Sequence, residues 1–71
     1  MKTRHELTVL LKRLIWEAGG VEAFAAKVGI HLNTAENWYC GRTVPTGGPT
    51  ICKLARATGL PVEEFFMEKT P

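Results

Sequence analysis

Glycines divide the middle of this 71-residue chain into short segments with a helical pattern. In the first segment, residues 21–28, the apolar positions have the spacing of one face of an α-helix. These positions are Val21, Phe24, Ala25 and Val28. Gly29 then breaks the pattern, because glycine readily adopts a positive φ. A second short segment, residues 32–39, is followed by Gly41. The stretch 19–45 therefore predicts two short helices joined by a glycine turn.

The rest of the chain continues the helical pattern. Thr3 and Glu6 have the spacing of a capping box, which marks the start of a helix. Pro49 and Pro61 are suited to the first turns of two further helices. We expect an all-α fold that forms one domain over residues 1–71. Its five helices are predicted at about 4–18, 21–28, 32–39, 49–58 and 62–67.

Helical spacing also predicts which side chains face the core. The inward positions expected for residues 32–39 and 62–67 are Ala35, Trp38 and Tyr39, and Val62, Phe65 and Phe66. The outward positions expected in the first of these segments are Leu32, Asn33, Glu36 and Asn37. Val9 and Trp16 lie seven residues apart and off the apolar stripe of their helix. Either Trp16 packs under the last helix, or the two residues belong to a surface for a partner.

The composition limits the class of protein. Hydrophobic residues make up 45% of the chain and charged residues 23%, which is typical of a globular protein and not of a disordered one. No apolar run approaches the roughly 20 residues of a membrane span, and the N-terminus lacks the pattern of a signal peptide. We expect a cytoplasmic protein without a membrane partner.

The few metal-binding side chains are scattered. His5, His31, Cys40 and Cys52 have neither CxxC nor HxxxH spacing, so we expect reduced cysteines, no metal and no cofactor. His31 and Cys40 are also too far apart on a helix to act as a base and a nucleophile, and no carboxylates are paired at a cleft spacing. The chain is therefore not expected to be an enzyme.

Charge is distributed unevenly along the sequence. Residues 1–60 carry eight lysines and arginines against four glutamates, whereas residues 61–71 carry three glutamates and one lysine. A basic body with an acidic tail suits a domain that faces phosphate on one side. The alternative interpretation is that these charges only solvate the surface.

The two-helix unit resembles a known family in its special positions. It has a small residue at Ala25, a turn glycine at Gly29 and inward residues at Ala35 and Trp38. In this respect the chain resembles the Cro and lambda-repressor-like helix-turn-helix family, including Cro-like or YdaS-like members carried by phages and prophages. The likeness covers roughly residues 6–66, with the W-x-x-G-R pattern that starts at Trp38 and the LARATGLPVEEFF segment. It implies a compact five-helix lambda-repressor-like DNA-binding domain whose second and third helices form the helix-turn-helix.

The resemblance also implies which residues read DNA. It places Leu32, Asn33 and Asn37 over base edges in the major groove, with Thr34 able to reach a base or the backbone. Asparagine can pair with adenine and leucine can pack on a thymine methyl, so an A/T-containing half-site is expected. Glu36 could accept a hydrogen bond from cytosine, although a solvated role suits it better. The alternative is that Asn33 and Asn37 are ordinary solvent-exposed surface residues.

Contacts to the DNA backbone are expected at the edges of this footprint. Helix N-termini offer free N–H groups to phosphate, and basic side chains add charge. The residues assigned to such contacts are Val21, Lys27, His31, Arg42, Thr43 and Thr46. The family usually has serine or threonine where this chain has His31, so a contact there could depend on pH.

Two functional hypotheses follow. The first is a sequence-specific transcriptional regulator, of which a repressor is the most natural form, that binds a pseudo-palindromic double-stranded DNA operator as a homodimer in the cytoplasm, on the nucleoid. The second is a helix-turn-helix-derived protein-interaction module or antitoxin with weak or no DNA binding. In that case Trp16, Leu32 and the C-terminal phenylalanines would hold the partner. Affinity for any duplex at low salt discriminates between the two hypotheses.

Overall fold

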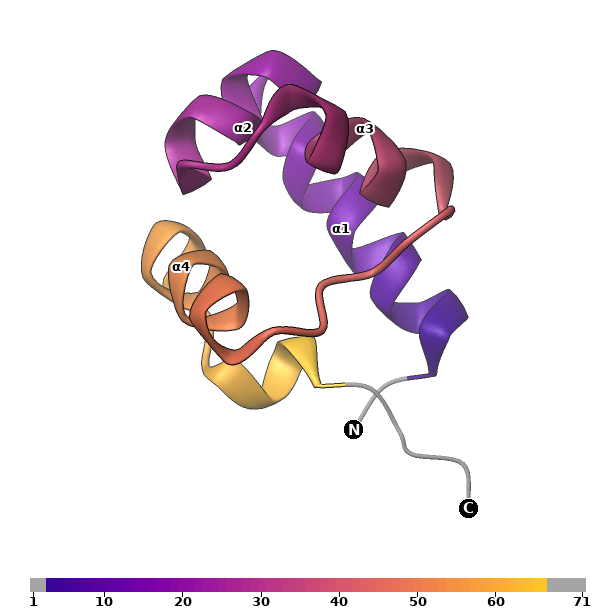
Figure 1. Ribbon diagram of the computed structural model, residues 1–71, viewed down its shortest axis with the longest axis vertical. Coiled ribbons are helices and arrows are strands. Elements are labelled where there is room, and N and C mark those ends of the chain that lie inside the picture. Colours follow the sequence, from indigo (N-terminus) through magenta and orange to yellow (C-terminus); the bar gives the residue numbers. More distant parts are fainter. Residues whose placement is uncertain (1–2, 67–71) are drawn as a thin grey trace.

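The computed structural model describes residues 3–66, and within them the chain forms α-helices and one turn of 3-10 helix without any strand (Figure 1). The elements are α1 (Arg4–Ala18), α2 (Val21–Val28), α3 (Leu32–Cys40), α4 (Gly48–Thr58) and η1 (Val62–Phe65). The prediction of an all-α fold is confirmed. The four α-helices begin and end within one residue of the predicted bounds, because capping residues and glycines act locally.

The fifth helix is the exception. In place of an α-helix over 62–67, the described part of the chain contains a single 3-10 turn, and residue 67 lies outside the described range. Phe66 is already extended, with φ −82° and ψ 135°. One turn directs only one large side chain inward, so Phe65 is fully buried whereas Phe66 is 41% exposed. The expectation that Phe66 covers the core was therefore wrong.

The start of α1 follows the predicted capping box. The Thr3 hydroxyl accepts a hydrogen bond from the Glu6 backbone N–H at 3.2 Å, and the Glu6 carboxylate accepts one from the Thr3 N–H at 3.1 Å. These two bonds satisfy backbone donors that the first turn of a helix leaves unpaired. Local chemistry thus sets where the longest helix begins.

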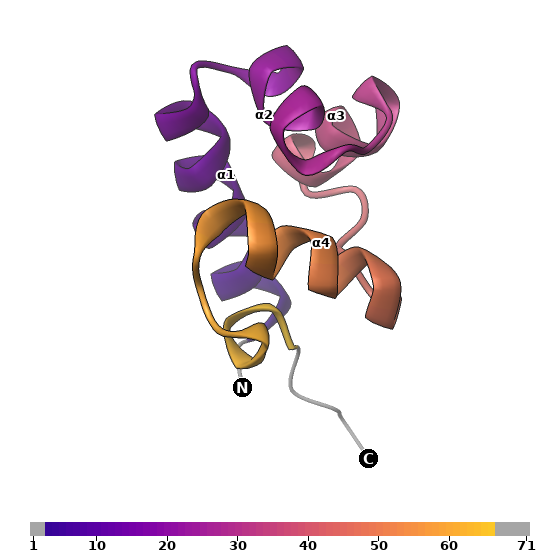
Figure 2. The same ribbon diagram turned by 90° about the vertical axis from the view of Figure 1, so that its left-hand side faces the viewer.

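The core lies between α1 and the three other α-helices. Its buried residues are Leu7, Leu11, Ile15, Phe24, Ala25, Val28, Ala35, Trp38, Val44, Ile51, Leu54 and Phe65. Phe24 and Trp38 meet edge to face, with ring centroids 6.5 Å apart and planes at 72°. η1 lies beside the first turn of α1, at the end of the molecule opposite α2 (Figures 1 and 2). Within residues 3–66 no polar or charged side chain is buried, so the core itself is entirely apolar.

Candidate nucleic-acid interface

α3 presents a ridge of side chains away from the core. Ala35 and Trp38 are buried, as predicted, whereas Leu32 is 38% exposed and Asn33 and Glu36 are exposed as well. Asn37 is half-buried at the edge of this ridge. Tyr39 was expected to be buried, but it is 41% exposed, because its position falls on the side of α3 that faces the surface of α1.

The polar groups of this ridge are free to bind a ligand. Among residues 3–66, no hydrogen bond engages the side chain of Asn33, Thr34 or Asn37. Each amide offers two N–H donors and one carbonyl acceptor, and the threonine hydroxyl can do both. The N-terminal half of α3 therefore carries unused hydrogen-bonding capacity on an exposed surface.

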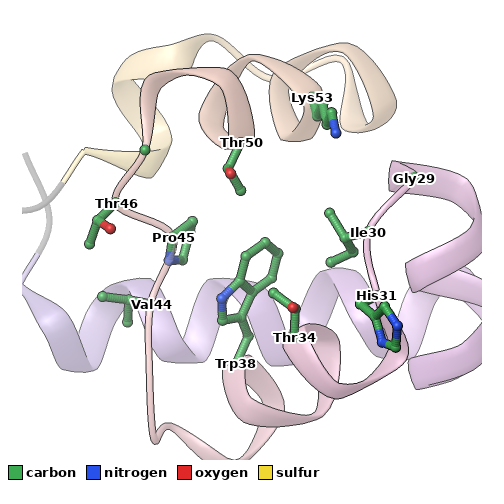
Figure 3. Close-up of a pocket in the computed structure, with 11 residues that line it drawn as sticks. Gly29, Ile30, His31, Thr34, Trp38, Val44, Pro45, Thr46, Thr50 and Lys53 are labelled. Atoms are coloured by element: carbon green, nitrogen blue, oxygen red, sulfur yellow. The ribbon is translucent and has the colours of Figure 1, made fainter.

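A groove of about 410 Å³ runs along one flank of α3, between this helix and α4 (Figure 3). We call it the α3–α4 groove. Its lining residues are Gly29, Ile30, His31, Thr34, Trp38, Val44, Pro45, Thr46, Gly47, Thr50 and Lys53. In Figure 3 the Trp38 indole stands in the middle, with Thr34 beside it and Thr50 pointing toward it from α4. The groove thus has an apolar floor and a rim of three threonine hydroxyls.

The charge of the α3–α4 groove favours an anion. Lys53 lines it and no carboxylate does. Gly47, the N-cap of α4, provides no side-chain cap, and Pro49 follows in the first turn. Thr50 and Lys53 were not predicted as site residues. Their i, i+3 spacing on one helix face was the available signal, but only the fold shows that this face lies across from α3.

The opposite flank of α3 is held closely by α1. The Arg4 guanidinium donates hydrogen bonds to the backbone carbonyls of Arg42, at 2.7 Å, and Gly41, at 3.4 Å. Gly41 has φ +78°, and a Cβ there would lie 3.4 Å from the Thr8 methyl carbon. The Lys12 ammonium lies 5.8 Å from the centre of the Tyr39 ring, so Lys12 is more than a solvated charge. These contacts fix where α3 ends.

The residues assigned to backbone contacts fall into three places. Val21 and Lys27 lie at the two ends of α2, the first half-buried and the second exposed. Arg42 and Thr43 are exposed in the segment directly after α3. His31 and Thr46 line the α3–α4 groove together with Thr34. His31 is the N-cap of α3 but makes no side-chain cap hydrogen bond. The fold therefore joins His31, Thr34 and Thr46 in one groove. The other residues assigned to backbone contacts lie outside it: Val21, Lys27, Arg42 and Thr43.

Two further features were looked for among the described residues. Within residues 3–66, no three His, Cys, Asp or Glu side chains are placed to hold a metal ion. No helix among the described residues has the length and apolarity to span a membrane. A comparison with protein families, with curated proteins and with solved structures finds no significant match to the chain.

Proposed function

We propose that this chain is a DNA-binding transcriptional regulator in which α2 and α3 form a helix-turn-helix of the lambda-repressor-like kind. The observation that carries the proposal is the ridge of α3, whose amide side chains are exposed or half-exposed and have no hydrogen-bond partner among residues 3–66. A short helix with free amides at its N-terminal end is suited to the major groove, where base edges present donors and acceptors.

In this proposal α3 lies in the major groove. Asn33 and Asn37 pair with adenine, Leu32 packs on a thymine methyl, and Thr34 bonds to a base or to phosphate. The phosphate backbone then passes along the rim of the α3–α4 groove. The carboxylate-free lining and the Lys53 ammonium support this path.

The small size of the domain supports binding as a pair. A single module contacts few bases, so tight binding requires two half-sites about 34 Å apart on one face of the duplex. We propose a pseudo-palindromic operator, at which the protein represses by occlusion. Such a regulator works in the cytoplasm, on the nucleoid.

Selection of binding sites from a random duplex pool, followed by titration at several salt concentrations, tests the proposal. We expect an enriched palindrome with A/T-containing half-sites. Asn37→Ala should reduce discrimination at one base pair by about 1–3 kcal/mol. Arg42→Ala should weaken binding to all sequences and lower the salt slope by about 0.9. If both variants bound every duplex as the wild-type protein does, α3 would not be the reading helix.

A second candidate is a protein-interaction module. It is favoured by the carboxylate of Glu36, exposed on the ridge of α3, and by Trp16, which is 80% exposed. A carboxylate near phosphate is unfavourable, and an exposed tryptophan is typical of an interface. Absence of binding to any duplex at 20 mM salt would favour this candidate, because every DNA reader binds non-specifically at about that salt.

A further inference from the structure

The outer face of α1 exposes an aromatic side chain that the fold does not use. We define this face by Val9, Arg13, Trp16 and Glu17. Trp16 is 80% exposed and Val9 53%, whereas the opposite side of the helix is buried through Leu7, Leu11 and Ile15. Burial of one tryptophan removes about 150–250 Å² of surface from water, so covering Trp16 with a partner is energetically favourable.

The charges on this face are arranged for a second α1 running in the opposite direction. Arg13 and Glu17 lie one turn apart on the same side of the helix, 3.8 Å from each other, with side chains 75% and 51% exposed. In a parallel pair, Arg13 would face Arg13 of the partner subunit and Glu17 would face Glu17 of the partner subunit. Like charges directly opposite each other are unfavourable, so a parallel arrangement is excluded on this face.

Among antiparallel arrangements, the register decides which side chains meet. If Val9 were opposite Trp16 of the partner subunit, Arg13 would be opposite Lys12 of the partner subunit, another like-charge pair. A shift by about one helical turn instead places Arg13 opposite Trp16 of the partner subunit, with Glu17 of the partner subunit beside it. Val9 then lies near the glycine turn at which α1 of the partner subunit ends. This register gives Arg13 a cation–π contact with Trp16 of the partner subunit and an opposite charge in Glu17 of the partner subunit. The two-fold symmetry repeats both contacts.

We propose that α1 is the homodimer interface of this protein, packed antiparallel on α1 of a second copy through Val9, Arg13, Trp16 and Glu17. The contact is isologous, since each copy supplies both the tryptophan and the charge pair, and such a contact closes at two subunits.

The two-fold axis has a consequence for α3. The axis runs perpendicular to the antiparallel helices. Each flank of α1 therefore lies on the same side of the dimer as the identical flank of α1 in the partner subunit. Tyr39 of α3 contacts the Lys12 flank of α1. Both copies of α3 therefore lie on the same side of the dimer. This step rests on the proposed function, because it matters only if both helices face one duplex.

Sedimentation equilibrium of the purified protein without DNA tests the interface. We expect a reversible monomer–dimer equilibrium. Trp16→Ser should weaken it by about thirtyfold, the effect of removing an aromatic hot spot. Arg13→Glu or Glu17→Arg alone should weaken it by about tenfold, and the double variant should regain most of the loss. Arg56→Glu is the matched control, because Arg56 is an exposed arginine on α4. It should leave the equilibrium unchanged.

Three results would overturn the interface: a protein that stays monomeric up to about 1 mM, a dimer that Trp16→Ser leaves intact, or a charge-swapped double variant that dimerises no better than the single variants. All substituted side chains are exposed, so circular dichroism should show the same helix content in every variant. A half-site duplex separates this inference from the proposed function. Binding of the half-site without self-association would overturn only the dimer, and self-association without any DNA binding would overturn only the DNA reader.

Discussion

The two flanks of α3 are built in different ways. On the α1 flank, Arg4 binds the backbone carbonyls of Gly41 and Arg42, Thr8 lies close to Gly41, and Lys12 covers Tyr39. On the groove flank, an open volume of about 410 Å³ separates α3 from α4. Trp38 takes part in both the core and the groove, because its ring is buried against Phe24 of α2 and also lines the groove. The difference suggests that one flank sets the position of α3 and the other leaves room for a ligand.

The largest expected effect comes from Trp38, because its ring is buried in the core and also lines the groove flank of α3. Trp38→Ala should lower the free energy of unfolding by about 3–5 kcal/mol, since a buried aromatic leaves a cavity that the core cannot fill. Urea denaturation of the dilute protein measures this effect. Trp16→Ala is the matched control, because the same substitution at an exposed site should change the free energy by no more than about 0.5 kcal/mol. Similar losses for both variants would mean that burial of the Trp38 ring does not hold α3 in the core.

A smaller effect is expected on the α1 flank. Gly41→Ala should lower the free energy of unfolding by about 1–2 kcal/mol, because alanine is disfavoured at the positive φ of Gly41. The measurement is thermal or urea unfolding at equal protein concentration. Gly48→Ala provides the comparison, since Gly48 has no positive φ and a Cβ there would meet nothing within 4 Å. If the two variants unfolded alike, the left-handed conformation of Gly41 at the end of α3 would not matter for stability.

The smallest expected effect is on the salt dependence of DNA binding. It is measured by comparing Lys53 on the groove flank with Lys12 on the α1 flank. Lys53→Ala should weaken binding to all duplexes and lower the salt slope by about 0.9, because one phosphate contact is lost from the groove. Lys12→Ala should leave the slope unchanged, since Lys12 lies over Tyr39. Fluorescence anisotropy at four or five salt concentrations measures both. Equal slopes for the two variants would contradict the assignment of the groove flank to phosphate.

Much of the fold could be predicted because its signals are local. The Thr3–Glu6 pair and the glycines at 19, 29, 41 and 59 set the ends of helices within a few residues of themselves. Helical spacing placed Ala35 and Trp38 inward, as observed. The same reasoning failed for Tyr39, because residues on the border between two faces are buried or exposed according to the neighbouring helix. It failed for Phe66 because periodicity does not distinguish an α-helix from a single 3-10 turn.

The candidate site was predicted less completely. Its exposed ridge on α3 follows from periodicity, and Leu32 and Asn33 are exposed as the pattern predicts, whereas Asn37 is half-buried at the edge of the ridge. The α3–α4 groove does not follow from it, since Thr34 and Lys53 are separated by most of a helix and a loop in the chain. The hydrogen bond from Arg4 to the Arg42 carbonyl does not follow from periodicity either, because the two residues are 38 positions apart in the sequence.

By itself, the sequence determined where four α-helices begin and end and which side chains of each point inward, because caps, glycines and apolar spacing act over a few residues. Only the tertiary structure decided which flank of α3 is closed and which is open. Those features depend on how α1 and α4 pack against α3, and packing brings together residues such as Arg4 and Gly41 whose pairing no local pattern encodes. The exposure of Trp16 belongs to the same category, since Trp16 is 80% exposed and η1, the last described turn, packs beside the other end of α1 (Figures 1 and 2).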